Sequence, residues 1–120
     1  MSNETNKKRA AYRLGHWAEV WASFILLMKG YSILKRRYKT PQGEIDIIIK
    51  RGSTIAFVEV KARGDLESAA FAITPRQQKR IEGAAKGFVA QNPRYAEYFC
   101  RFDAVLVAPK RWPTHITNAW

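Results

Sequence analysis

Apolar side chains recur every three or four residues in the first quarter of the chain. The repeating positions are Leu14, Trp17, Ala18, Trp21, Ile25 and Met28. This spacing is typical of one face of a helix and predicts a helix over residues 10–29. Gly30 follows it, and glycine ends many helices because it readily adopts left-handed backbone angles. Residues 1–9 are polar and basic, and we expect them to form a flexible arm.

Beyond this helix, apolar and polar residues alternate, which is the period of a β-strand. Strands are expected over residues 31–38, 44–50, 54–62 and 101–108. The first of them is rich in basic residues, as exposed or edge strands often are. Thr74-Pro75-Arg76-Gln77 combines an N-cap threonine, a proline suited to the first helical position and a capping-box glutamine. It predicts the start of a second helix, which Asn92-Pro93 ends.

The predicted order is therefore helix, three strands, helix and strand, in one α/β domain over residues 10–108 with a tail over 109–120. A chain of 120 residues with 47% hydrophobic positions can bury a core, which excludes a mostly disordered protein. The longest apolar stretch, residues 17–28, is too short to span a bilayer. No signal-peptide cleavage site follows it. We expect a cytoplasmic protein without membrane attachment.

The balance of charge is strongly basic. The chain has 21 Lys and Arg against 10 Asp and Glu, a formal net charge of +11. Such a charge predicts an anionic partner, with nucleic acid favoured over an acidic membrane surface. Cys100 is the one cysteine, which excludes an internal disulfide and a cysteine-based zinc site.

Four polar residues gather on one predicted hairpin. Gly52-Ser53 is typical of a two-residue turn, which fixes the register of the flanking strands. Asp46 would then face Glu59, and Glu44 would face Lys61, on one side of the sheet. The other side would hold the apolar residues Ile45, Ile47, Val58 and Val60.

Two opposed carboxylates repel each other unless a cation or a proton lies between them. A Mg²⁺ ion, or Mn²⁺ in its place, would satisfy Asp46 and Glu59 and could polarise a phosphodiester held by the basic surface. Beside these carboxylates the ammonium form of Lys61 is favoured. We therefore expect Lys61 to orient the attacking water and stabilise transition-state charge rather than to abstract a proton. The alternative is a polar sheet face whose charges are simply solvated.

The segments Gly43-Glu44-Ile45-Asp46 and Phe57-Val58-Glu59-Val60-Lys61-Ala62-Arg63 resemble the PD-(D/E)xK motif of the restriction-endonuclease-like superfamily. The match is closest to the small bacterial YraN-type family, which is similar to archaeal Holliday junction resolvases. Ile45 stands where the name of the motif has proline. The resemblance implies an α-β-β-β-α-β core with a mixed β-sheet flanked by helices. It also implies that Asp46, Glu59 and the first-helix Glu19 hold the metal, with Lys61 as the catalytic lysine.

Other polar residues are candidates for the surroundings of this site. Glu19 could instead pair with a surface Lys or Arg. Arg63 lies on the same strand face as Lys61 and is a candidate phosphate contact. The further candidates for nucleic-acid contact are Arg36, Arg37, Arg76, Lys79 and Arg80, although a row of such charges can also be a solvated face. Gln78 and Lys79 could approach the site from the second helix, with Glu44 in support.

Other residues have structural explanations as well. Asp103 is expected to tether Arg101 or a loop rather than to bind metal. Trp112 and Trp120 in the tail could stack on bases or cover an apolar patch.

These residues predict a Mg²⁺-dependent endonuclease that hydrolyses DNA phosphodiesters, with branched, Holliday-junction-like DNA as one substrate class. The alternatives are a non-catalytic nucleic-acid-binding module with a nuclease-like fold and a scaffold for protein partners. The resemblance leaves a homodimer open, and the sequence pattern contains no unexplained apolar stripe that requires one.

Overall fold

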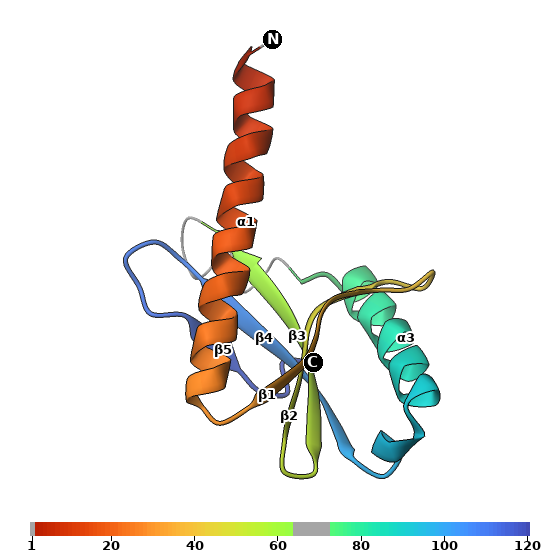
Figure 1. Ribbon diagram of the computed structural model, residues 1–120. Coiled ribbons are helices and arrows are strands. Elements are labelled where there is room, and N and C mark those ends of the chain that lie inside the picture. The colour runs from red at the N-terminus through yellow and green to blue at the C-terminus, as the bar shows by residue number, and fades with distance from the viewer. Residues whose placement is uncertain (1, 64–72) are drawn as a thin grey trace.

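A mixed five-stranded sheet lies between two helices in the computed structural model (Figure 1). The structure describes residues 2–63 and 73–120, with side chains from Gly15 onward. The elements are α1 (Ser2–Met28), β1 (Ser32–Lys39), β2 (Glu44–Arg51), β3 (Thr54–Ala62), α3 (Pro75–Gln91), the 3-10 turn η1 (Pro93–Tyr95), β4 (Phe99–Val107) and β5 (Thr114–Ile116). The predicted order of helices and strands is confirmed. The loop predicted between β3 and α3 lies largely outside the described residues.

The strands are arranged in the order β1-β2-β3-β4-β5. β3 and β4 pair in parallel, and the other neighbours pair antiparallel. The parallel pair needs a crossover connection, and this connection contains α3. The mixed sheet flanked by helices, which the resemblance implied, is therefore confirmed.

The end of α1 follows from a single glycine. Gly30 has φ 89°, and its N–H donates to the Leu27 carbonyl at 3.0 Å while the Tyr31 N–H donates to the Leu26 carbonyl at 3.1 Å. These two bonds form a Schellman motif, as the position of Gly30 predicted. The start of the helix differs from the prediction, because α1 begins at Ser2 and residues 2–9 are helical. No glycine or proline lies in that segment to stop the helix.

The start of α3 is also encoded locally. The Gln77 N–H donates to the Thr74 hydroxyl at 3.2 Å, and the Thr74 N–H donates to the Gln77 side-chain carbonyl at 3.3 Å. This reciprocal pair is the predicted capping box, with Pro75 at the first helical position.

Each helix covers one face of the sheet. Against α1 lie Ile47, Ile49, Ala56, Val58, Val60, Val105 and Val107. Against α3 lie Ile45, Ile48, Ile55 and Phe57. The prediction that Ile45 shares a face with Ile47 is therefore wrong. Arg37 has φ 51° and lies between Arg36, which pairs with Ile47, and Tyr38, which pairs with Ile45.

α1 carries apolar residues on its outward face as well. Trp17, Val20, Phe24, Leu27 and Met28 are all exposed large hydrophobic residues. The prediction that Trp17 and Met28 share one face with Ala18 and Ile25 is therefore wrong for these two residues. A helix that is apolar on both faces has no clear amphipathic period. No helix in the described part of the chain is long and apolar enough to cross a membrane.

The predicted tail is part of the domain. β5 pairs with β4, and the Trp120 ring stacks on Phe102 with ring centroids 5.6 Å apart. β5 was not predicted, because three residues bounded by turns are too few to show a period. Of the two roles weighed for Trp120, covering an apolar patch is the one observed.

Asp103 is fully buried beneath this segment. Arg101 donates to its carboxylate through two nitrogens, each at 2.8 Å, and the Asn118 N–H donates to it at 3.2 Å. Asp103 therefore tethers both Arg101 and the C-terminal loop, as predicted. Its charge is satisfied within the fold, apart from the candidate site.

The turn between β1 and β2 contacts α3 at Gly43. A Cβ atom on Gly43 would lie 2.5 Å from the Arg80 carbonyl oxygen and 2.9 Å from the Arg80 carbonyl carbon. Backbone atoms cannot rotate away as a side chain can. Gly43 thus sets how closely α3 approaches the hairpin that carries Asp46.

We predict that Gly43→Ala lowers the free energy of unfolding by about 1–3 kcal/mol, because the added methyl group forces α3 and the hairpin apart. Gly87→Ala is the matched control, since a Cβ there meets nothing within 4 Å in the same helix. It should raise stability by up to about 1 kcal/mol. Urea unfolding of both variants measures the difference, and equal effects of the two substitutions would contradict this account of Gly43.

Candidate active site

The site begins where β2 leaves β3. The paired residues of this ladder run from Arg51–Thr54 to Ile47–Val58, which confirms the predicted register for the inner part of the hairpin. At the next position the Asp46 side chain replaces the backbone as hydrogen-bond acceptor, because its Oδ2 accepts a hydrogen bond of 2.8 Å from the Val60 N–H. The expected ladder pairs at Asp46 and Glu44 are therefore not formed. Instead, a side chain continues the hydrogen bonding while the strands separate.

Asp46 and Glu59 nevertheless come together. Their carboxyl groups are hydrogen-bonded to each other, and Glu59 is only 8% exposed. Burial and the Asp46 charge raise the pKa of Glu59 from 4.5 to about 8. Burial also raises the pKa of Asp46, although the bonds from Glu59 and Val60 oppose this. Glu59 therefore keeps its proton at neutral pH.

Lys61 provides a cation beside Glu59. Its Nζ lies 3.6 Å from Glu59 Oε1, and both side chains are largely buried. Lys61 lowers the pKa of both carboxyl groups through its charge, but burial outweighs it. The predicted grouping of Asp46, Glu59 and Lys61 is thus present, with the lysine neutralising the charge that the two acids share.

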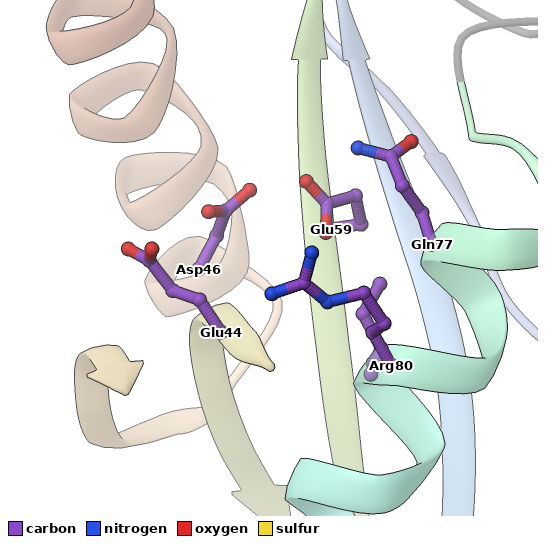
Figure 2. A pocket seen from close by; sticks show the side chains of 6 residues that line it. Glu44, Asp46, Glu59, Gln77 and Arg80 are labelled. Carbon is purple, nitrogen blue, oxygen red and sulfur yellow. The ribbon is translucent and has the colours of Figure 1, made fainter. Parts of the chain in front are cut away.

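These acids open into a hollow of about 270 Å³ beneath the first turns of α3. We call it the acid hollow; its lining residues are Glu44, Asp46, Glu59, Gln77, Arg80 and Ile81. Figure 2 shows the Arg80 guanidinium reaching from α3 toward the carboxyl groups, with Gln77 one turn earlier. The Arg80 Nε also donates to the Gln42 carbonyl at 3.4 Å. Gln77 lines the hollow where Gln78 was predicted.

Glu19 approaches the same region from α1. Its carboxylate accepts two hydrogen bonds from Arg37, from Nε at 3.2 Å and from Nη2 at 3.0 Å. Its charge helps to raise the pKa of Asp46, which places it close to the acid pair. Of the two roles weighed for Glu19, the ion pair with an arginine is the one observed. The same ion pair occupies the Arg37 side chain, which was predicted to contact nucleic acid.

The remaining predicted residues lie around the hollow or apart from it. Arg63 is exposed, and its Nη1 donates to the neighbouring Ala62 carbonyl at 2.7 Å. The Gln78 amide donates to the Ile73 carbonyl at 3.4 Å. Arg36, Arg76 and Lys79 are exposed to solvent.

The donor chemistry of the acid pair fits a hard divalent cation. Within the described residues no three His, Cys, Asp or Glu side chains form a cluster that could hold a metal ion. The set available is therefore Asp46 and Glu59, and Mg²⁺ typically takes one or two carboxylates together with water and substrate oxygens. A cation there would displace the Glu59 proton, because metal ligands must be deprotonated.

The acid pair makes the metal-free protein sensitive to pH. Because the folded protein holds a proton on Glu59 that the unfolded chain releases above pH 4.5, stability should fall as the pH rises toward 8. We predict a loss of about 1–3 kcal/mol between pH 5 and pH 8 in EDTA. Glu59→Gln should remove most of this dependence, while Glu97→Gln, at an exposed carboxylate, should keep it. Denaturant unfolding across this range measures it, and a flat wild-type profile would contradict a proton held on Glu59.

Comparison with known proteins gives the family. Residues 18–107 match the model of "Uncharacterised protein family UPF0102". A UPF0102 protein of Parvibaculum lavamentivorans is 51% identical over 111 residues, which cover 92% of this chain and 84% of the relative. UPF0102 proteins of Bradyrhizobium diazoefficiens and Rhodopseudomonas palustris are 54% and 56% identical over the same length, covering 84% and 85% of those relatives. The chain therefore belongs to the UPF0102 family.

Proposed function

We propose that this protein is a metal-dependent endonuclease that hydrolyses DNA phosphodiester bonds. The observation that carries the proposal is the pair of half-buried Asp46 and buried Glu59, which faces an open hollow beside Lys61 in a protein of net charge +11. Burying two carboxyl groups against each other costs stability, and carboxyl groups with strongly shifted pKa values cluster at functional sites. The resemblance to the PD-(D/E)xK motif, and through it to Holliday junction resolvases, supports the same assignment.

Asp46 and Glu59 are the residues that would hold Mg²⁺ or Mn²⁺. A bound divalent cation supplies Lewis-acid polarisation of a phosphate and a more acidic bound water. The protein contributes the geometry, since the Val60 N–H fixes one Asp46 oxygen at 2.8 Å. Because one Asp46 oxygen is held by the backbone, its other oxygen is the one oriented for a ligand.

Lys61 would stabilise the charge that develops on the phosphate. Its position next to Glu59 on β3 keeps the ammonium group at the acid pair. With Asp46 and Glu59 holding a cation, the Lys61 donors would be available to phosphate oxygens or to the attacking water. Orientation rather than proton abstraction is the role that this setting supports.

Arg80 would hold the substrate phosphate at the mouth of the acid hollow. Its guanidinium faces the carboxyl groups (Figure 2), and among the described residues it has no carboxylate partner within 4.0 Å. Planar guanidinium groups bind phosphate with two parallel hydrogen bonds. Branched DNA is a substrate class to test because of the resolvase resemblance.

A non-catalytic nucleic-acid-binding module is the second candidate. One observation favours it: Arg37 occupies the carboxylate of Glu19, which the resemblance implied to be a third metal ligand. Such a protein would keep the fold and bind DNA without turnover. The two functions differ in metal dependence, which a single experiment measures.

We expect linear, nicked, flapped or four-way DNA to be cut in Mg²⁺ or Mn²⁺ and not in EDTA. Asp46→Asn, Glu59→Gln and Lys61→Met should each lower the cleavage rate by about 100-fold or more, because each removes a group at the reacting phosphate. Glu97→Gln and Lys86→Met are matched controls at exposed positions and should cut at the wild-type rate.

All variants need identical purification, since contaminating nucleases cut DNA in the same buffers. Cleavage that survives in Asp46→Asn would exclude this site. Salt-sensitive DNA binding with no cutting by the wild type would establish the binding module instead. Mg²⁺ should also raise the melting temperature of the wild type and not of Glu59→Gln, which tests metal binding apart from activity.

A further inference from the structure

A second hollow, which the acid site does not use, lies between α1 and the turn that follows β4. It has a volume of about 380 Å³. Its principal lining residues are Trp17, Trp21, Val107, Lys110, Arg111 and Trp112. We call it the tryptophan hollow. Three of the four tryptophans of the chain meet there, together with two cationic side chains.

The aromatic rings of this hollow are fixed by each other. Trp21 contacts Trp17 edge-to-face at 5.9 Å between centroids and Trp112 at 5.6 Å. Trp17 and Trp112 are nevertheless 44% and 61% exposed. Large aromatic surface is thus held in one arrangement and left open to solvent, which is typical of a preformed recognition surface.

We propose that the tryptophan hollow binds an unpaired nucleobase of a single-stranded nucleic acid. An aromatic surface bordered by cations fits a single strand, because its bases stack on the rings and its phosphates contact Lys110 and Arg111. A second copy of this chain fits less well. Each copy carries a net charge of +11, and exposed Lys110 and Arg111 would meet their own like charges.

The tryptophan hollow lies at the end of the sheet toward which the acid hollow also lies. Val107 pairs with Ala62 across β3 and β4, and its carbonyl accepts the Arg63 N–H at 3.2 Å. Glu59 lies four residues before Arg63 on this stretch of chain, about 13 Å away at the usual rise of a strand. A strand whose phosphate lies in the acid hollow, on the α3 side of the sheet, would pass round this end of the sheet at Arg63 to reach the tryptophan hollow on the α1 side.

This inference rests on the proposed function for its nucleic-acid class and names the substrate more closely. The preferred substrate would combine a phosphodiester at the acid hollow with a single-stranded segment at the tryptophan hollow. Flaps, overhangs and opened junctions have such segments, whereas an intact duplex has none. The stacking site itself does not depend on cleavage.

The test is the affinity of labelled oligothymidylate by fluorescence anisotropy in EDTA, where cleavage plays no part. Trp112→Leu should weaken binding about tenfold or more, because the variant no longer stacks on a base. Trp112→Tyr retains an aromatic face and should remain within about threefold of the wild type. Phe99→Leu, at an exposed aromatic residue at the far end of β4, is the matched control and should bind normally.

Two further binding measurements identify the class of nucleic acid that binds. Oligouridylate distinguishes RNA from DNA as the source of the strand, and the annealed duplex of the same sequence should bind without dependence on Trp112. The double variant Lys110→Ala/Arg111→Ala should reduce the slope of log affinity against log salt by about 0.7 for each phosphate that the protein no longer neutralises.

Several results would overturn the proposal. These are a wild type that does not bind single strands, a Trp112→Leu variant that binds normally, or Leu and Tyr variants that are equally weak. Unchanged affinity with an altered sedimentation coefficient in Trp112→Leu would assign the hollow to a protein interface. A wild type that binds in this way but never cuts DNA would refute the endonuclease and leave the tryptophan hollow intact.

Discussion

The hydrogen bond from the Val60 N–H to the Asp46 carboxylate is the contact on which the candidate active site depends. It ends the β2–β3 ladder and lets the two strands separate while the Val60 N–H remains satisfied. Beyond this point Ile45 and Tyr38 pack against α3 rather than α1. The acid hollow lies in the space that this separation opens, beneath the first turns of α3.

The charged groups around the acid hollow have opposed effects on one another. Glu59 is buried next to Asp46, and Lys61 offsets only part of the resulting rise in the pKa of Glu59, so Glu59 keeps its proton at neutral pH. Glu19 would add a further negative charge, but Arg37 holds it in a two-bond ion pair. The left-handed backbone of Arg37 lies between the residues that pair with Ile47 and Ile45, which places strain beside the site. A divalent cation would replace the proton and relieve the repulsion.

Asp103 is also a buried acid, but hydrogen bonds within the fold stabilise its charge. Asp103 receives two bonds from Arg101, one contact with His115 and a backbone N–H, so its charge is fully satisfied. These contacts outweigh its burial and lower the pKa of Asp103. One buried acid thus holds the C-terminal segment in place, whereas Asp46 and Glu59 face an open hollow with Lys61 beside them. This contrast separates a structural carboxylate from a candidate ligand.

The sequence by itself determined whatever depends on neighbours in the chain. The capping box at Thr74, the glycine end of α1 and the inner register of the β2–β3 hairpin follow from local hydrogen bonding and from the period of each element. The grouping of Asp46, Glu59 and Lys61 followed from that register. Tertiary structure alone decided that Glu19 pairs with Arg37 and that Gln77 rather than Gln78 lines the acid hollow. It also decided which face of the sheet holds Ile45 and that β5 pairs with β4. Each of these depends on how distant segments pack, and local periodicity does not encode such contacts.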